Sequence, residues 1–480
     1  MQEQNKINDT EIHGYVHSLS NTERIFLWGL RSKIAVVARI IGNVSEKDLT
    51  RALHNVRRMH PLVGCRIIFD EYHNAFCSTD NVPENILRIV ARRSDIQWFD
   101  EIQHEHLIPF EPEKGPLVRF TLVHSPQVSE LIAFAHHSIC DGTAVAHLIH
   151  DILICYSNPA KEVRVIHPPK LTDYILKKES SSSSKSIEEV AFNNYNNQWK
   201  ERTHFFSQAD FNELYAAYWK KVRYNLVLLQ LEPEETLSLI SRCRDKGVTI
   251  VSAMTAALLA ARQEIMGSLP EDKNTIGIPF DLRRHLENSK AFCFFAGDFN
   301  LNFSYTQDKS FWENAQELHR IIQERVKMLD SSALDMRSFD PTLIDAIFSY
   351  APYVQKIPEA FNKTENLSAF ARDSNNIAFA ISQKILSKHP SIIVTNLGQL
   401  NFPEIYNDLR LDRIFFAPPA NESVPLILGG VGVSSRLVFS MIYLEKIGES
   451  SPLLTDNVIH IRNRVLQYLG FPEKANERAI

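Results

Sequence analysis

Residues 131–143 limit the fold of this chain more than any other stretch, because a short apolar run ends there at two adjacent histidines. The run covers residues 131–135 and is bounded on both sides, which predicts a buried strand. Asp141 and Gly142 favour a tight turn, since glycine adopts positive φ without steric cost. Apolar residues then recur at helical spacing over 143–156. The sequence therefore predicts a strand, a histidine-bearing turn and a helix, and the rigid strand end suits a residue that transfers protons.

Length and composition predict a folded protein of two domains. The chain has 480 residues, more than one ordinary core accommodates, with 44% hydrophobic and 23% charged residues. Its net charge is −5 and no basic stripe is present, which argues against a nucleic-acid partner. No apolar run reaches the roughly 18 residues of a membrane span, and residues 1–12 lack the pattern of a signal peptide. We therefore expect a cytoplasmic monomer without a membrane span.

A serine run at 180–184 predicts a flexible connection between the two domains. We expect an N-terminal domain over 1–179, a linker or crossover over 180–221 and a C-terminal domain over 222–480. The predicted strand 436–443 matches 130–137 in apolar character, and a predicted helix follows each of them. This similarity suggests a duplicated α/β unit in which Tyr443 stands opposite His137.

The cysteines and the remaining histidines do not form a recognisable metal-binding pattern. His104 with His106, and His147 with His150, are pairs that lack the third and fourth ligands of a metal site. We therefore expect no metal and reduced thiols rather than a disulfide framework. The six cysteines are scattered, without a C-x-x-C pair, at Cys65, Cys77, Cys140, Cys155, Cys243 and Cys293.

Four segments of the chain resemble the chloramphenicol-acetyltransferase-like superfamily, which includes condensation domains, plant BAHD acyltransferases and polyketide-associated O-acyltransferases. Residues 136–142, His-His-Ser-Ile-Cys-Asp-Gly, match its HHxxxDG motif. Residues 49–62 resemble its first long helix, 278–283 the end of its "pvDlR" strand, and 394–398 its "SNLG" segment. The resemblance implies an α/β (α+β) fold of two chloramphenicol-acetyltransferase-like domains, each a mixed β-sheet flanked by helices, with a tunnel between them.

The same resemblance implies an acyltransferase of the kind found in secondary metabolism. It would move an acyl group from a thioester, either acyl-CoA or a phosphopantetheine carrier, to the hydroxyl of a small-molecule acceptor, with no other cofactor and no covalent enzyme intermediate. An acyl carrier protein is an expected partner. The sequence has neither the Asp-Phe-Gly-Trp-Gly segment of BAHD enzymes nor a carrier-protein domain. A free-standing O-acyltransferase of the polyketide-associated or alcohol-acetyltransferase type is therefore expected.

His137 is the predicted general base, because a neutral imidazole can accept a proton near pH 7. The resemblance gives the base role to this second histidine and a structural role to His136. Asp141 is open to two interpretations, as a third member of a catalytic triad or as a structural anchor. The resemblance favours an ion pair between Asp141 and Arg283, with Arg284 as the alternative partner, and gives Gly142 a supporting role in the turn.

Other residues have weaker claims to a role in catalysis. Thr395 and Asn396 lie where the resemblance places residues near the tunnel, and Thr395 could donate to an oxyanion; the alternative is a plain turn. Cys140 is too close to His137 in the chain to serve as an independent nucleophile. The pattern HxxxxD from His136 to Asp141 also occurs in glycerolipid acyltransferases, but the apolar segments of those enzymes are absent from this sequence.

Two other functions stay open at this point. The first is a stand-alone condensation enzyme that forms an amide from an amine acceptor. The second is a non-catalytic scaffold of the same fold, against which the presence of His137, Asp141 and Arg283 argues.

Overall fold

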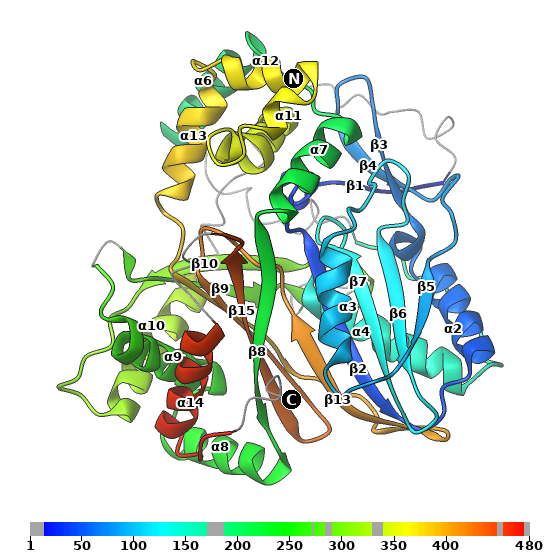
Figure 1. Cartoon of the computed structure of the whole chain (residues 1–480), viewed down its shortest axis with the longest axis vertical. Helices are drawn as coiled ribbons and strands as arrows, with labels where there is room; N and C mark the ends of the chain where they lie inside the picture. Colours follow the sequence, from blue (N-terminus) through cyan, green and yellow to red (C-terminus); the bar gives the residue numbers. More distant parts are fainter. Residues whose placement is uncertain are drawn as a thin grey trace.

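The computed structural model describes residues 14–169, 187–270, 273–283, 290–328, 339–448 and 455–474. Two six-stranded sheets, each mixed in strand direction, lie side by side, and helices cover them (Figure 1). The expected fold of two mixed sheets flanked by helices is confirmed. The serine run at 180–184 and Arg284 lie outside the described residues.

The first sheet has the strand order β12-β13-β2-β7-β6-β5 and is antiparallel except for the β5–β6 pair. Strand β7 lies inside the sheet, and its residues from Ser129 onward are buried, as expected of an apolar run covered on both faces. The strands are β2 (Lys33–Ile41), β5 (Leu87–Ala91), β6 (Val118–His124), β7 (Val128–His136), β12 (Ile405–Tyr406) and β13 (Leu409–Ala417).

Three helices accompany the first sheet, and together they form what we call the first lobe. Helix α4 (Gly142–Ser157) lies over β2 and β7 and packs against α2 (Glu46–Met59). Helix α3 (Gln97–His106) contacts β2 and β6, and also β8 of the second sheet. The apolar spacing of the predicted helix over 143–156 is explained by this packing, because its apolar residues are buried between the sheet and α2.

The second sheet, with the strand order β10-β9-β11-β14-β15-β8, is the centre of the second lobe. One face is covered by α8 (Pro233–Asp245), α9 (Ile250–Met266), an alanine-rich helix, α10 (Phe311–Met328) and α14 (Thr455–Tyr468). The other face joins the core of the first lobe. The strands are β8 (Val222–Leu231), β9 (Thr275–Asp281), β10 (Ala296–Asn302), β11 (Ile392–Gln399), β14 (Leu426–Val433) and β15 (Arg436–Lys446).

Strands β12 and β13 come from the second half of the chain but belong to the first sheet. β13 pairs along its length with β2, from Arg410 opposite Ile41 to Ala417 opposite Ala35. A strand from the predicted C-terminal domain (222–480) therefore pairs with one from the predicted N-terminal domain (1–179). The division of the chain into these two domains stays a prediction.

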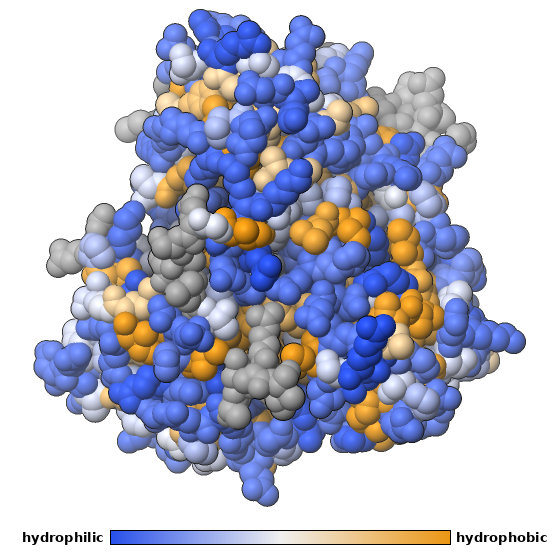
Figure 2. Space-filling view, in the orientation of Figure 1, coloured by the Kyte–Doolittle hydropathy of each residue, from blue (hydrophilic) through white to orange (hydrophobic). Residues whose placement is uncertain are grey.

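A group of helices caps one end of the molecule, drawn in green and yellow at the top of Figure 1. The indole of Trp199, near the end of the helix over 187–200, donates to Thr342 Oγ1 at 2.8 Å. This hydrogen bond joins that helix to the short helix over 341–345. Most large apolar side chains lie inside, and the surface in Figure 2 is largely hydrophilic with small apolar groups. The capping helices are α6 (Ile187–Lys200), α7 (Gln208–Trp219), α11 (Pro341–Asp345), α12 (Glu365–Arg372) and α13 (Ile377–Leu386).

A small sheet with the order β1-β4-β3 lies beside the first lobe. Its strands are β1 (Tyr15–Ser18), β3 (Arg66–Phe69) and β4 (Ala75–Ser78). Ser20 and Glu23 form a capping box at the start of helix α1 (Asn21–Arg24), which is only one turn long.

Strand β15 resembles β7 in its place in the sheet and in the chain. Each lies inside its sheet and precedes a helix that packs on the same lobe. Tyr443 of β15 is buried, and its hydroxyl contacts Thr455 at 2.6 Å. Tyr443 lies inside β15, whereas His137 follows the last residue of β7, so the correspondence of these two residues stays a prediction.

In the described part of the chain, no single helix is long and apolar enough to cross a membrane. Helices α8 and α9, which are bent by 96° at their junction, pass the same test only when taken together.

Candidate active site

His137 directly follows the last residue of β7, so the sheet holds its backbone. Its N–H donates to the Ser32 carbonyl at 2.7 Å. The half-buried imidazole stacks on Phe26 at a centroid distance of 4.0 Å and contacts Phe294 at 5.4 Å. Phe26 lies two residues after the end of α1, and Phe294 lies two residues before the start of β10. Two segments far apart in the chain therefore hold the ring between them.

The tautomer of His137 follows from one hydrogen bond. Nδ1 lies 2.8 Å from the Cys140 carbonyl oxygen, and a carbonyl only accepts, so Nδ1 carries the proton. Burial lowers the pKa of His137, and the hydrogen bond to Cys140 and the charge of Asp141 oppose that effect. The ring is then neutral near pH 7 and Nε2 carries a lone pair. No described side chain hydrogen-bonds to Nε2, so that nitrogen is available to accept a proton.

His136 is buried inside the first lobe, and its contacts do not suit a general base. It is 2% exposed, and its Nδ1 accepts from the Ser138 N–H at 3.3 Å and contacts the Ser138 hydroxyl at 2.8 Å. Burial, and then the charges of His137, Lys33 and Arg119, lowers the pKa of His136 to about 3. The structure therefore gives His136 structural contacts and no free position from which to accept a proton.

Asp141 forms a bidentate ion pair with Arg283. The two guanidinium nitrogens Nη1 and Nη2 donate to the two carboxylate oxygens at 2.9 Å each. Asp141 also accepts from the N–H groups of Ala144 at 2.8 Å, which caps α4, and Phe295 at 2.7 Å. Both partners are buried, with 5% exposure for Asp141 and 9% for Arg283. The carboxylate is thus fully occupied, and the proton on His137 Nδ1 goes to a carbonyl instead, so Asp141 is an anchor and not the third member of a triad.

Arg283, the partner of Asp141 in this ion pair, makes several further contacts. It follows β9, the strand whose end the sequence comparison singled out, and its guanidinium lies over the Phe295 ring at 4.6 Å. Nη2 also donates to the Cys293 carbonyl at 3.3 Å, and Nη1 to Asp281 at 3.1 Å. One guanidinium therefore joins the end of β9, the segment 291–295 and the first turn of α4.

Gly142 is required by the close approach of two strands. A Cβ at this position would lie 2.7 Å from the Phe416 ring of β13 and 3.0 Å from a methyl group of Leu397 in β11. Both contacts are with the ends of side chains packed in the core, so a larger residue here would force the Phe416 ring to shift. The glycine of the HHxxxDG motif thus lets the N-terminus of α4 meet the second half of the chain.

Thr395 and Asn396 point to opposite faces of β11, because side chains alternate along a strand. Thr395 shares a face with Ile393 and Leu397, which pack against the core of the first lobe. Asn396 shares the other face, and its Oδ1 accepts from the Gly398 N–H at 2.9 Å. Thr395 therefore faces the first lobe, on the side of Gly142, whereas Asn396 stabilises the end of the strand.

Cys140 is buried, with its sulfur 3.5 Å from the His136 carbonyl. Burial raises the pKa of its thiol well above the usual value, so the nucleophilic thiolate is disfavoured. The histidine pairs considered as metal ligands include two rings with packing contacts. His106 stacks on Trp219 and Tyr224, and His150 stacks on Phe402.

A narrow pocket opens beside the Asp141–Arg283 ion pair. It lies between α4 and the segment 290–292, and its polar lining includes His60, His147 and Asp151. A continuous tunnel between the lobes stays a prediction.

Sequence reasoning did not identify Phe26, Phe294 or the Phe295 N–H as parts of this site. The four residues Phe292-Cys293-Phe294-Phe295 are an unusually aromatic run. That run was the one available signal, but an aromatic run predicts burial rather than a position next to His137.

We predict that Asp141→Ala lowers the free energy of unfolding by roughly 3–5 kcal/mol, because it leaves Arg283 buried without its partner and removes the cap of α4. Chemical denaturation measures this loss. Asp281→Ala is the matched control, since it removes the outer carboxylate from the same guanidinium. The Asp281 side chain is 46% exposed, so its loss should cost less than about 1 kcal/mol. Equal losses for the two variants would contradict the anchoring role of Asp141.

The fold is similar to that of several proteins of known structure. The first condensation domain of the CDA synthetase superposes with a TM-score of 0.61 at 13% identity, covering 98% of this chain and 99% of that one. Polyketide synthase associated protein 5 from Mycobacterium tuberculosis gives 0.58 at 12% identity, covering 95% and 98%. The starter condensation domain of rhizomide synthetase, a variant in complex with C8-CoA and Leu-SNAC, gives 0.58 at 11% identity, covering 97% of each chain. At these identities the likeness shows the fold alone.

No curated protein shows significant sequence similarity to the chain. The sequence model of the Condensation domain family, however, matches residues 31–389, which include the HHxxxDG motif and Arg283. This chain therefore belongs to the condensation-domain family, within the superfamily that the four sequence segments indicated, and members of that family are acyl-transferring enzymes.

Proposed function

We propose that this protein transfers an acyl group from a thioester to the hydroxyl of a small-molecule acceptor, with His137 as general base. The observation that carries the proposal is the hydrogen bond from His137 Nδ1 to the Cys140 carbonyl, which leaves Nε2 as the proton acceptor. The acceptor hydroxyl gives its proton to Nε2 while its oxygen attacks the thioester carbonyl. The tetrahedral intermediate then collapses, the C–S bond breaks, and the proton on Nε2 passes to the leaving thiolate.

The donor in this proposal is an acyl-CoA or an acyl group on a carrier-protein phosphopantetheine. Condensation domains act on such thioesters, and one structural neighbour is described in complex with C8-CoA. No further cofactor is needed, because the thioester itself supplies the activated acyl group. The reaction proceeds without a covalent enzyme intermediate, since the buried Cys140 thiol is unsuited to attack.

Thr395 is the proposed donor to the oxyanion of the tetrahedral intermediate. Its place on the face of β11 that meets the first lobe supports this role. Asn396 has a supporting role in this proposal, because its side-chain oxygen accepts from the Gly398 N–H and so fixes the backbone that follows Thr395.

An amine acceptor is the alternative, and membership of the condensation-domain family favours it. We expect that thiol release from a series of acyl-CoA chain lengths is accelerated by alcohols and not by amines. The assay measures free thiol, and mass spectrometry identifies the ester. If only amino acids or amino-acid thioesters accelerate thiol release, the product is an amide and the proposed ester formation is wrong. No transfer to either class from CoA or from a loaded carrier protein would indicate a non-catalytic scaffold.

We predict that His137→Ala lowers kcat by ~10²- to 10⁴-fold, the range that general bases contribute. The Cys140 carbonyl lies on the backbone, so Cys140→Ala keeps the partner of His137 and serves as the comparison. That variant should retain activity within a few-fold. A His137→Ala protein with near wild-type turnover would eliminate the base role, and loss of activity in Cys140→Ala alone would revive covalent catalysis.

The pH dependence should follow the lowered pKa of His137. Because the base must be deprotonated, kcat/KM should fall as the pH drops through a pKa below 6.5, and should be flat above it. A pH–rate profile measured with a saturable acceptor tests this. An acid limb centred above 6.5, or none in a range where the protein stays folded, would contradict the assignment.

A further inference from the structure

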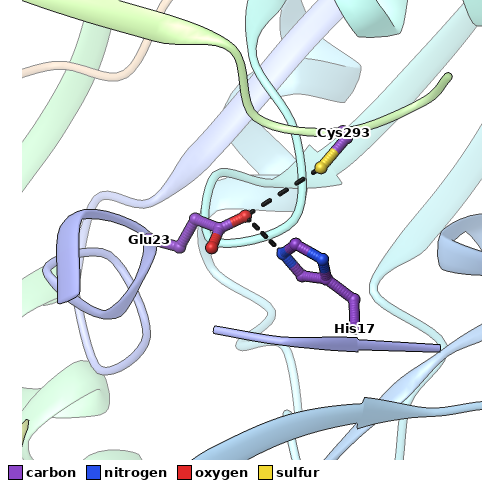
Figure 3. Close-up of side chains that lie close together, drawn as sticks. All are labelled: His17, Glu23 and Cys293. Atoms are coloured by element: carbon purple, nitrogen blue, oxygen red, sulfur yellow. Dashed lines mark hydrogen bonds and ion pairs between the residues drawn. The ribbon is translucent and has the colours of Figure 1, made fainter. Parts of the chain in front are cut away.

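Three side chains of metal-ligand type meet in the interior of the protein. His17 comes from β1, Glu23 from α1 and Cys293 from the segment before β10 (Figure 3). Their ligand atoms all lie within 4.8 Å of one another, and the side chains are between 0% and 8% exposed. Nothing in the acyl-transfer reaction uses them.

The spacing of the three atoms suits a small tetrahedral ion. Bond lengths of about 2.0 Å to nitrogen or oxygen and 2.3 Å to sulfur place neighbouring ligands roughly 3.3–3.5 Å apart. His17 Nε2 lies 2.9 Å from Glu23 Oε1, and Cys293 Sγ lies 4.0 Å from the same oxygen. Shifts of about half an ångström would bring these two distances to those of a Zn²⁺ site, and the third pair, His17 Nε2 and Cys293 Sγ, lies within 4.8 Å and would have to close toward about 3.5 Å.

The ligands are also oriented by surrounding hydrogen bonds, as metal ligands usually are. The second oxygen of Glu23 accepts from the Ser20 N–H at 2.7 Å and from its hydroxyl at 2.8 Å, so Oε1 is turned toward His17 and Cys293. The carbonyl of Cys293 accepts from Arg283. The backbone of His17 pairs with that of Cys77 in β4.

The cluster is linked to the catalytic ring through its immediate neighbours in sequence. Glu23 lies three residues before Phe26, and Cys293 directly precedes Phe294, so the two aromatic rings beside His137 are carried by the two segments that supply ligands. A bond from each segment to one ion would fix the separation of these rings.

We propose that His17, Glu23 and Cys293 bind one Zn²⁺ ion, with water as the fourth ligand, and that the ion positions Phe26 and Phe294 around His137. Nitrogen, carboxylate and thiolate together favour zinc over magnesium or calcium. Binding displaces the proton of the Cys293 thiol to solvent and leaves His17 neutral, so the site gains the ion and releases protons without any redox change. The proposal is independent of the acyl acceptor.

The competing explanation is that His17 and Glu23 form only an ion pair. The carboxylate of Glu23 outweighs the effect of burial and raises the pKa of His17, so a charged pair at 2.9 Å would account for their contact without a metal. An ion pair of His17 and Glu23 does not involve Cys293. Whether the Cys293 sulfur binds a metal ion therefore distinguishes the two explanations.

Co²⁺ titration of the full-length protein, purified under reducing conditions and stripped of metal, provides the test. We expect a thiolate-to-Co²⁺ charge-transfer band that saturates at one ion per chain and is displaced by Zn²⁺, together with a rise in the unfolding temperature on adding Zn²⁺. Cys293→Ser should lose the band. Ser20→Ala keeps all three ligands and should weaken binding roughly 10-fold.

Cys243→Ala is the matched control, because Cys243 is also buried but lies in α8 of the second lobe. It should bind Co²⁺ as the wild type does, and so should Cys77→Ala. Absence of a band in the wild-type protein would overturn the proposal without relying on a variant. A band that persists in Cys293→Ser, or that disappears only in Cys77→Ala, would overturn the ligand set.

Discussion

The buried ion pair between Asp141 and Arg283 connects parts of the chain that the rest of the active site needs in fixed positions. Two charges taken out of water are costly, and they are tolerated only where every oxygen and most donors find partners. Here the carboxylate accepts from Arg283, Ala144 and Phe295, so one side chain caps α4, holds the end of β9 and fixes the segment before β10. The position of Phe294 beside His137 depends on that segment.

His137 combines a rigid backbone with a ring whose surroundings set its protonation. The strand end and the Cys140 carbonyl determine which nitrogen carries the proton. Contact with Phe26 and Phe294 removes water from the ring, which disfavours the charged form and keeps a proton acceptor available near neutral pH. A lower pKa also makes a weaker base, so the reaction depends on holding the acceptor close to Nε2.

The two lobes are not separate units along the chain. Strand β13 leaves the second half to pair with β2, and its Phe416 packs on Gly142 at the start of α4. The two halves of the chain therefore share the first sheet as well as an ion pair.

Local patterns in the sequence were sufficient to predict β7, α4 and the motif between them, because burial on one face of a strand or helix imposes a period that the residues must follow. The ordered motifs also indicated the family and the two mixed sheets. The partnership of Asp141 with Arg283 came from the resemblance and not from any local pattern, since 142 residues separate them. Only the tertiary structure decided that β13 joins the first sheet, that Phe26 and Phe294 surround His137, and that His17 and Glu23 meet Cys293 from 270 residues away. Contacts of this kind depend on how whole elements pack, and a one-dimensional pattern records which face of an element is buried but not what covers it.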